Sequence, residues 1–118
     1  MKRGDVIIVD FPFSDAVGSK VRPALIVQAD ELNRRLDDTI LALITSSRSH
    51  FTGSATQLPI DVSAPDGRES GLRLSSVVQC ENLVTVDKSF VIHVIGRLSC
   101  ALMRQIDDCL KAALDIQS

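Results

Sequence analysis

Short, solidly apolar segments separated by turn-forming residues constrain the fold of this chain most. Residues 40–44 (ILALI) form the strongest run, and residues 6–9, 21–28, 72–83 and 90–95 are further candidates. Such runs between turn signals predict β-strands. Because their apolar residues are continuous and do not alternate with polar ones, we expect both faces of the sheet to be buried.

Two prolines refine the predicted sheet. Pro23 lies in the second candidate strand, and Pro59 lies in another candidate at residues 56–60. Proline has no N–H to donate, so it belongs near a strand start or on an edge strand. Residues 56–60 are therefore predicted to form an edge strand. Pro23 also biases Arg22 away from helical backbone angles.

The connections between these strands are rich in turn-forming residues. Asp30 is expected to cap a short helical turn that ends at Leu36. Ala-Pro-Asp-Gly at residues 64–67 predicts a tight turn. The remaining connections are expected at residues 12–19, 46–54 and 84–88.

An amphipathic helix is predicted after Ser99, which is a good N-cap residue. Leu98 and Met103 have the spacing of a hydrophobic staple. Apolar residues then recur at helical spacing: Leu102, Ile106, Cys109, Leu110 and Ala113. The helix should lay this stripe on the sheet.

The chain has 118 residues, which favours a single domain over residues 1–118. We expect an α+β fold that is mainly β. The mean hydropathy of the chain, +0.18, is high for so small a protein. One helix cannot cover both faces of the predicted sheet, so a homodimer is the simplest explanation for the surplus apolar surface.

The sequence argues against a strongly basic nucleic-acid-binding protein, a zinc-binding protein and a membrane protein. A net charge of −2 means that any surface for nucleic acid must be a local patch. Cys80, Cys100 and Cys109 match no zinc-binding pattern. Cys80 lies in an apolar run and Cys109 on the apolar face of the predicted helix, so both are expected to be buried as small apolar residues. No signal peptide and no apolar run of membrane-spanning length is seen, so a cytoplasmic location and no membrane association are expected.

The densest motif is Gly-Ser-Lys-Val-Arg-Pro-Ala at residues 18–24. A glycine-bearing loop delivers Lys20 and then Arg22, whose backbone is stiffened by Pro23. The planar guanidinium of arginine matches a phosphate with two parallel hydrogen bonds. An ion pair between Arg22 and a surface aspartate explains the motif equally well.

A second motif, Thr-Ser-Ser-Arg-Ser-His at residues 45–50, follows the most apolar strand. Hydroxyl groups at the end of a buried strand can point into a cleft, although serine and threonine also simply end strands. His50 lies in this polar loop, where it could contact RNA. His93 interrupts an apolar strand and is interpreted as a core or interface residue.

The acidic residues do not suggest metal-dependent chemistry. Asp5 is interpreted as a structural anchor for a nearby amide or arginine, and Asp37 and Asp38 as a pair in a loop. A two-metal nuclease needs more converging carboxylates than the sequence offers. We therefore expect no metal site and no cofactor.

Taken in order, several segments resemble the PemK/MazF family of toxins, and its PemK-like branch in particular. These segments are residues 3–6 (RGDV), 10–15 (DFPFSD), 18–27 (GSKVRPALIV), 42–46 (ALITS), 76–78 (SVV), 86–88 (VDK) and 95–99 (IGRLS). Together they extend over nearly the whole chain.

The resemblance implies an SH3-like barrel of mostly antiparallel strands with a C-terminal helix, assembled as a homodimer. It implies a type II toxin that cuts single-stranded RNA at short sequences without a metal and is blocked by a cognate antitoxin. The arginine before proline is then catalytic Arg22, and the threonine that ends the third strand is catalytic Thr45. Residues expected to bind RNA are Lys20, Pro23, Ser46, Ser47, Arg48 and His50. Loop residues 14–20 and 46–56 would decide which bases are recognised.

The chemistry implied by the family is self-consistent. The ribose 2′-hydroxyl attacks its own phosphate, which leaves a 2′,3′-cyclic phosphate and a free 5′-hydroxyl. Arg22 would stabilise the developing charge and Thr45 would donate one more hydrogen bond, while the general base stays unnamed. Two alternatives remain: a toxin of the same fold that binds DNA gyrase, and a catalytically inactive binding barrel.

Overall fold

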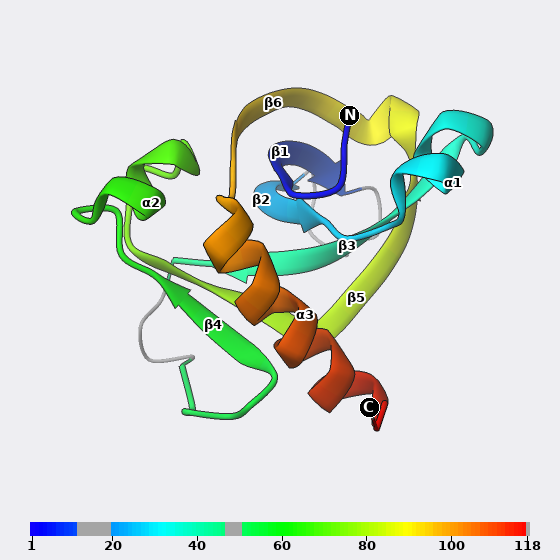
Figure 1. Cartoon of the computed structure of the whole chain (residues 1–118). Helices are drawn as coiled ribbons and strands as arrows, with labels where there is room; N and C mark the ends of the chain where they lie inside the picture. The colour runs from blue at the N-terminus through cyan, green and yellow to red at the C-terminus, as the bar shows by residue number, and fades with distance from the viewer. Residues whose placement is uncertain (12–19, 47–50, 118) are drawn as a thin grey trace.

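Figure 1 shows the computed structural model, which describes residues 1–11, 20–46 and 51–117. Within these ranges one six-stranded sheet has the strand order β4-β5-β3-β2-β1-β6, and every neighbouring pair is antiparallel. The strands are β1 (Asp5–Phe11), β2 (Lys20–Ile26), β3 (Asp38–Thr45), β4 (Gln57–Ile60), β5 (Ser76–Asp87) and β6 (Val91–Arg97). The sheet curls strongly and stays open between β4 and β6 (Figure 1). The expected barrel-like, mainly β fold is confirmed.

The C-terminal helix α3 (Cys100–Leu114) packs against β4 and β5, as Figure 1 shows. Its predicted cap is confirmed, because the Ser99 hydroxyl accepts a hydrogen bond from the Leu102 amide at 3.2 Å. The other helical segments are short: α1 (Asp30–Arg35), α2 (Pro65–Glu69) and the 3-10 helix η2 (Lys88–Phe90).

Two apolar clusters occupy the two faces of the sheet. Successive residues of β1 alternate between them: Val6 joins the first cluster, and Ile7 and Val9 join the second. Ile106 and Cys109 of α3 belong to the first cluster. The second cluster is covered by residues of the same chain, because Phe90 and Val91 pack against it. A second copy is therefore not needed to bury the second face, and that argument for a dimer is wrong.

The predicted ends of several helices and strands differ from the observed ones. Residues 84–88 were expected to form a connection, but Thr85 and Asp87 continue β5 and pair with Ile40 and Asp38 of β3. The strand begins at Ser76 and not at residue 72. The turn expected at residues 64–67 is the first turn of α2, with Pro65 at its start. Pro59 does lie in an edge strand, as predicted.

Asp5 and Asp30 both anchor the N-terminal segment of the chain. Asp5 accepts a hydrogen bond from the Lys2 amide at 2.9 Å, so its structural interpretation is confirmed. Asp30 does not cap α1, where Ala29 is the N-cap residue. Its carboxylate accepts a hydrogen bond from the Arg3 amide at 2.6 Å instead, and this bond holds the pKa of Asp30 below its ordinary value.

Cys80 and Cys109 are buried as predicted, and Cys100 is exposed at the first residue of α3. None of the helices in the described part of the chain is long and apolar enough to cross a membrane.

Candidate functional site

Arg22 and Thr45 lie on adjacent strands near one end of the sheet. In the β2–β3 ladder Ala24 pairs with Leu43, and continuing this antiparallel register by two residues places Arg22 opposite Thr45. Directly opposed residues have Cβ atoms about 5 Å apart and project from the same face. The fold therefore brings together two side chains that are 23 residues apart in the sequence.

These two residues line a hollow of about 370 Å³, called here the Arg22 hollow. Its lining residues are Val21, Arg22, Pro23, Ile44, Thr45 and Ser46. Arg22 and Ser46 are exposed and Thr45 is half-buried. The hollow therefore offers one cation and two hydroxyl groups to an anion that enters from solvent.

Arg22 is held by its backbone while its side chain stays accessible. It pairs with Val9 of β1, and Pro23 next to it has a fixed φ angle. Among the residues that the structure describes, the ion pairs are Arg3–Asp107 and Arg35–Glu31, and Arg22 takes part in neither. The alternative of a surface ion pair for Arg22 finds no partner in this part of the chain.

A second hollow of about 510 Å³ continues from the first, with Pro23 and Ser46 common to both. We call it the Arg73 hollow. Its other lining residues are Ile8, Gly71, Leu72, Arg73, Leu74, Ser76, His93 and Ile95. Arg73 and His93 are exposed there. Of the two interpretations of His93, the core residue is therefore wrong, and the interface residue stays a prediction. Together the two hollows place Arg22, Arg73 and His93 along one continuous surface.

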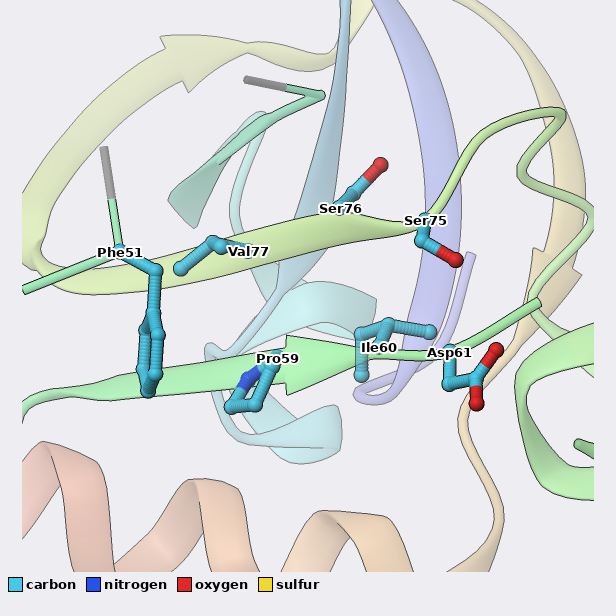
Figure 2. A pocket seen from close by; sticks show the side chains of 7 residues that line it. All are labelled: Phe51, Pro59, Ile60, Asp61, Ser75, Ser76 and Val77. Atoms are coloured by element: carbon cyan, nitrogen blue, oxygen red, sulfur yellow. The ribbon is translucent and has the colours of Figure 1, made fainter. Parts of the chain in front are cut away.

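A third hollow of about 280 Å³, the Phe51 hollow, shares Ser76 with the second. Figure 2 shows the Phe51 ring beside Pro59 at one end, and Asp61 and Ser75 at the other end. Ile60, Ser76 and Val77 complete the lining. This hollow thus has an apolar end with an aromatic ring and a polar end with a carboxylate and a hydroxyl group.

Of the six predicted RNA-binding residues, three lie in the described part of the chain. Pro23 and Ser46 lie where the Arg22 and Arg73 hollows meet. Lys20 is the first residue of β2, two residues before Arg22. Ser47, Arg48 and His50 lie outside the described residues.

Sequence reasoning missed Arg73, Asp61 and Phe51. Asp61 follows β4 and Arg73 precedes β5, and only folding brings Arg73 together with Ser46 in the Arg73 hollow and Asp61 together with Ser75 in the Phe51 hollow. A signal for Phe51 was present, because it is an aromatic residue within the loop 46–56 that was expected to recognise bases. Such a residue in a polar loop is a candidate for stacking.

The Arg22 hollow has no carboxylate among its described lining residues. Asp10 of β1 pairs with Val21, and its Oδ1 is buried with no hydrogen-bond partner among the described residues. In that part of the chain, no three His, Cys, Asp or Glu side chains cluster in a way that could hold a metal ion.

Comparison with protein families gives one match that extends over almost the whole chain. Residues 2–114 match the family described as PemK-like, MazF-like toxin of type II toxin-antitoxin system.

Among characterised relatives, the chain is 33% identical over 117 residues to endoribonuclease EndoA of Bacillus subtilis (strain 168), covering 97% of this chain and 94% of EndoA. It is 30% identical over 118 residues to endoribonuclease MazF6 of Mycobacterium tuberculosis, with 98% of each covered.

Solved structures agree in fold. A mycobacterial endoribonuclease in complex with its cognate antitoxin superposes with a TM-score of 0.77 at 24% identity, covering 100% of this chain and 98% of that one. MazF of Deinococcus radiodurans gives a TM-score of 0.73 at 15% identity, with 98% and 97% covered. At these identities the superpositions show a shared fold.

Proposed function

The chain belongs to the family of PemK-like, MazF-like toxins of type II toxin–antitoxin systems, and from this membership we propose that it is an endoribonuclease that cuts single-stranded RNA in the Arg22 hollow. Its relatives are named endoribonucleases and align with it over nearly their whole length. The proposed place of action is the cytoplasm, where messenger RNA is found.

The observation that carries the proposed active site is the shared hollow of Arg22 and Thr45. A cation and a hydroxyl group on adjacent strands form a fixed pair of donors that one phosphate can engage together. Donors that are already in place when charge develops contribute more than donors that must reorganise. The exposed guanidinium leaves room for the phosphate of a polymer, which must pass across the site.

In the proposed reaction the substrate supplies its own nucleophile. The 2′-oxygen gives its proton to a nearby carboxylate or water molecule and attacks the adjacent phosphorus, the bond from phosphorus to the 5′-oxygen breaks, and that oxygen gains a proton. The products are a 2′,3′-cyclic phosphate and a 5′-hydroxyl. Because both reacting groups belong to one nucleotide, alignment supplies much of the acceleration.

Arg22 and Thr45 take different parts in this reaction. Arg22 stabilises the charge on the non-bridging phosphate oxygens, since arginine stays protonated and is a poor base. Arg22 is also proposed to donate the proton that the leaving 5′-oxygen gains. Thr45 adds one hydrogen bond to the same phosphate. Lys20, Pro23 and Ser46 are proposed to position the strand beside them, together with Ser47, Arg48 and His50.

Two protein partners follow from family membership. One is a cognate antitoxin, as in the solved complex of the mycobacterial endoribonuclease. The other is a second copy of this chain. The edge strand β6 carries two exposed apolar side chains, Ile92 and Val94, which are 50% and 47% exposed. Contiguous exposed apolar side chains of this kind mark protein interfaces.

The proposed chemistry is tested by incubating the purified protein with a long single-stranded RNA in EDTA. We expect discrete fragments that end in a cyclic phosphate and begin with a 5′-hydroxyl, because the proposed steps use only side chains and the 2′-hydroxyl. Complete loss of cleavage in EDTA, with recovery on adding magnesium, would contradict this mechanism. Absence of cleavage under any condition would favour a toxin that acts by binding.

A further inference from the structure

The Phe51 hollow lies on the same face of the sheet as Thr45. Thr45 pairs with Val77 of β5, and Val77 pairs with Pro59 of β4. Directly opposed residues project from one face, so all three side chains share it. Adjacent strands are about 4.8 Å apart, which puts Pro59 about 10 Å from Thr45. A phosphate at Thr45 can therefore have the base of a flanking nucleotide in the Phe51 hollow.

The apolar end of this hollow suits a flat ring. Phe51 is 41% exposed, and its ring lies beside Pro59 with Val77 near it (Figure 2). Unpaired bases in single-stranded RNA are held mainly by stacking on aromatic side chains. The volume of about 280 Å³ is just below the range of about 300–1,000 Å³ that holds drug-sized ligands, so a single base fits it better than a whole nucleotide.

The polar end of the hollow carries a carboxylate with a fixed orientation. Asp61 Oδ1 accepts hydrogen bonds from the Ser63 amide at 2.9 Å and the Ser63 hydroxyl at 2.7 Å. A carboxylate has two oxygens and about four acceptor positions in all, so it can accept hydrogen bonds from several donors at once. Ser75 Oγ accepts from the Val62 amide at 3.2 Å, which leaves its hydroxyl hydrogen for another acceptor.

These contacts select bases by their hydrogen-bonding edge. A carboxylate accepts hydrogen bonds and repels carbonyl oxygens, so it favours a base that presents an amino group. Guanine, cytosine and adenine carry such a group, while uracil presents two carbonyl oxygens around one N–H. The Ser75 hydroxyl can donate to the ring nitrogen or carbonyl next to that amino group.

We propose that the Phe51 hollow binds the base of a nucleotide that flanks the scissile phosphate, stacks it on Phe51, and selects an amino-bearing base over uracil through Asp61. This inference rests on the proposed RNA cleavage at Arg22 and Thr45. Phe51 and Asp61 are thereby specificity-determining residues, separate from the catalytic pair.

The test is to sequence the cleavage ends that the protein produces from a randomised single-stranded RNA. For the wild-type protein we expect uracil to be disfavoured by about 5- to 100-fold at one fixed position next to the cut. Asp61→Asn, which adds a donor to the side chain, should remove this preference at that position and leave the other positions unchanged. Phe51→Leu should lower kcat/KM by about 5- to 100-fold on all sequences, because it removes the stacking ring.

Matched controls separate these effects from loss of fold. Asp66→Asn removes an exposed acid on α2 that does not line the hollow, and Ile116→Ala removes an exposed apolar side chain at the C-terminus. Both should cleave as the wild type does. The half-exposed Phe51 can be replaced without disturbing the core, so Phe51→Leu remains informative even if Asp61→Asn fails to fold.

Each outcome has one meaning. Wild-type cleavage without a preference next to the cut, unaltered preferences in a folded Asp61→Asn variant, or a wild-type rate in Phe51→Leu would each overturn the inference and leave the proposed cleavage standing. Absence of RNA cleavage by the wild-type protein would overturn the proposed function, and this inference with it.

Discussion

Arg22 and Cys80 show how burial decides what one side chain can do. Arg22 has a backbone fixed in β2 and an exposed guanidinium, so its charge is available to a ligand. Cys80 is fully buried between β5 and α3 and belongs to the same cluster as Cys109. Burial raises the pKa of Cys80 to about 12 and also raises the pKa of Cys109. Since only a thiolate is nucleophilic, these two thiols should be inert in the folded protein.

The thiols give a prediction at the scale of single residues. At about pH 8 a thiol-reactive dye should label Cys100 rapidly and should label Cys80 and Cys109 only after unfolding. Cys100→Ser should therefore show no fast-reacting thiol until urea is added. Rapid labelling of the folded Cys100→Ser variant would contradict the burial of the other two.

The raised pKa of Cys80 also sets the direction in which the stability of the protein changes with pH. The folded state holds the Cys80 proton more tightly than the unfolded state, whose thiol has the ordinary pKa of 9.0. This contribution is complete below about pH 9 and is lost as the pH rises toward 12. Urea midpoints measured at increasing alkaline pH should therefore fall.

At the scale of elements, strong local patterns were predictable and weak ones were not. The apolar runs of β1 and β3 and the cap and stripe of α3 each follow from a few neighbouring residues. The extension of β5 past residue 83 was missed because Thr85 and Asp87 are held there by pairing with β3, a contact between distant segments. The hollows were missed for the same reason. Arg22 and Thr45 were found because they stand in recognisable motifs.

The junction of α2 and β6 depends on one close approach. Gly71 has φ of +73°, and a Cβ atom there would collide with the Ile95 carbonyl of β6. Gly53 has a similar φ of +77°, but a Cβ atom there would meet nothing within 4 Å. The two glycines therefore share backbone strain and differ in packing. Gly71 also lines the Arg73 hollow, so this contact shapes the groove.

We expect Gly53→Ala to cost about 1–2 kcal/mol of unfolding free energy, from the left-handed backbone alone. Gly71→Ala should cost about 1–3 kcal/mol more, because the backbone must also move away from Ile95. Urea denaturation of both variants measures the difference. Equal losses would show that α2 and β6 can separate freely, against the packing described here.

At the scale of the whole molecule, residues of the same chain cover both faces of the sheet, and the charge is distributed unevenly over the surface. Continuous apolar strands suggested a partner for the second face, but Phe90 and Val91 cover that face from within the chain. The feature of the structure that supports a dimer is the exposed apolar surface of β6. The net charge of −2 coexists with Arg22, Arg73 and His93 along one groove. Binding to RNA should therefore be local and sensitive to salt.

The dimer prediction belongs to this scale. Light scattering at micromolar concentration should give twice the chain mass of 12.8 kDa. Ile92→Glu should shift the protein toward monomer, because it places a charge in the apolar patch on β6. Ile116→Glu, an equally exposed position on the C-terminal segment, should leave the dimer intact. A wild-type monomer, or a dimer that survives Ile92→Glu, would contradict this interface.

The proposed activity of the whole molecule depends on Arg22, and its substitution by alanine tests that claim most directly. The decisive measurement is the RNA-cleavage rate and the melting temperature of one Arg22→Ala sample. If Arg22 stabilises charge on the phosphate, cleavage should fall by about 100- to 1000-fold while the melting temperature stays near that of the wild type. Arg22→Lys should restore little, because a point charge on a flexible stem cannot replace the planar guanidinium. A folded Arg22→Ala protein that cleaves RNA at the wild-type rate would contradict the account.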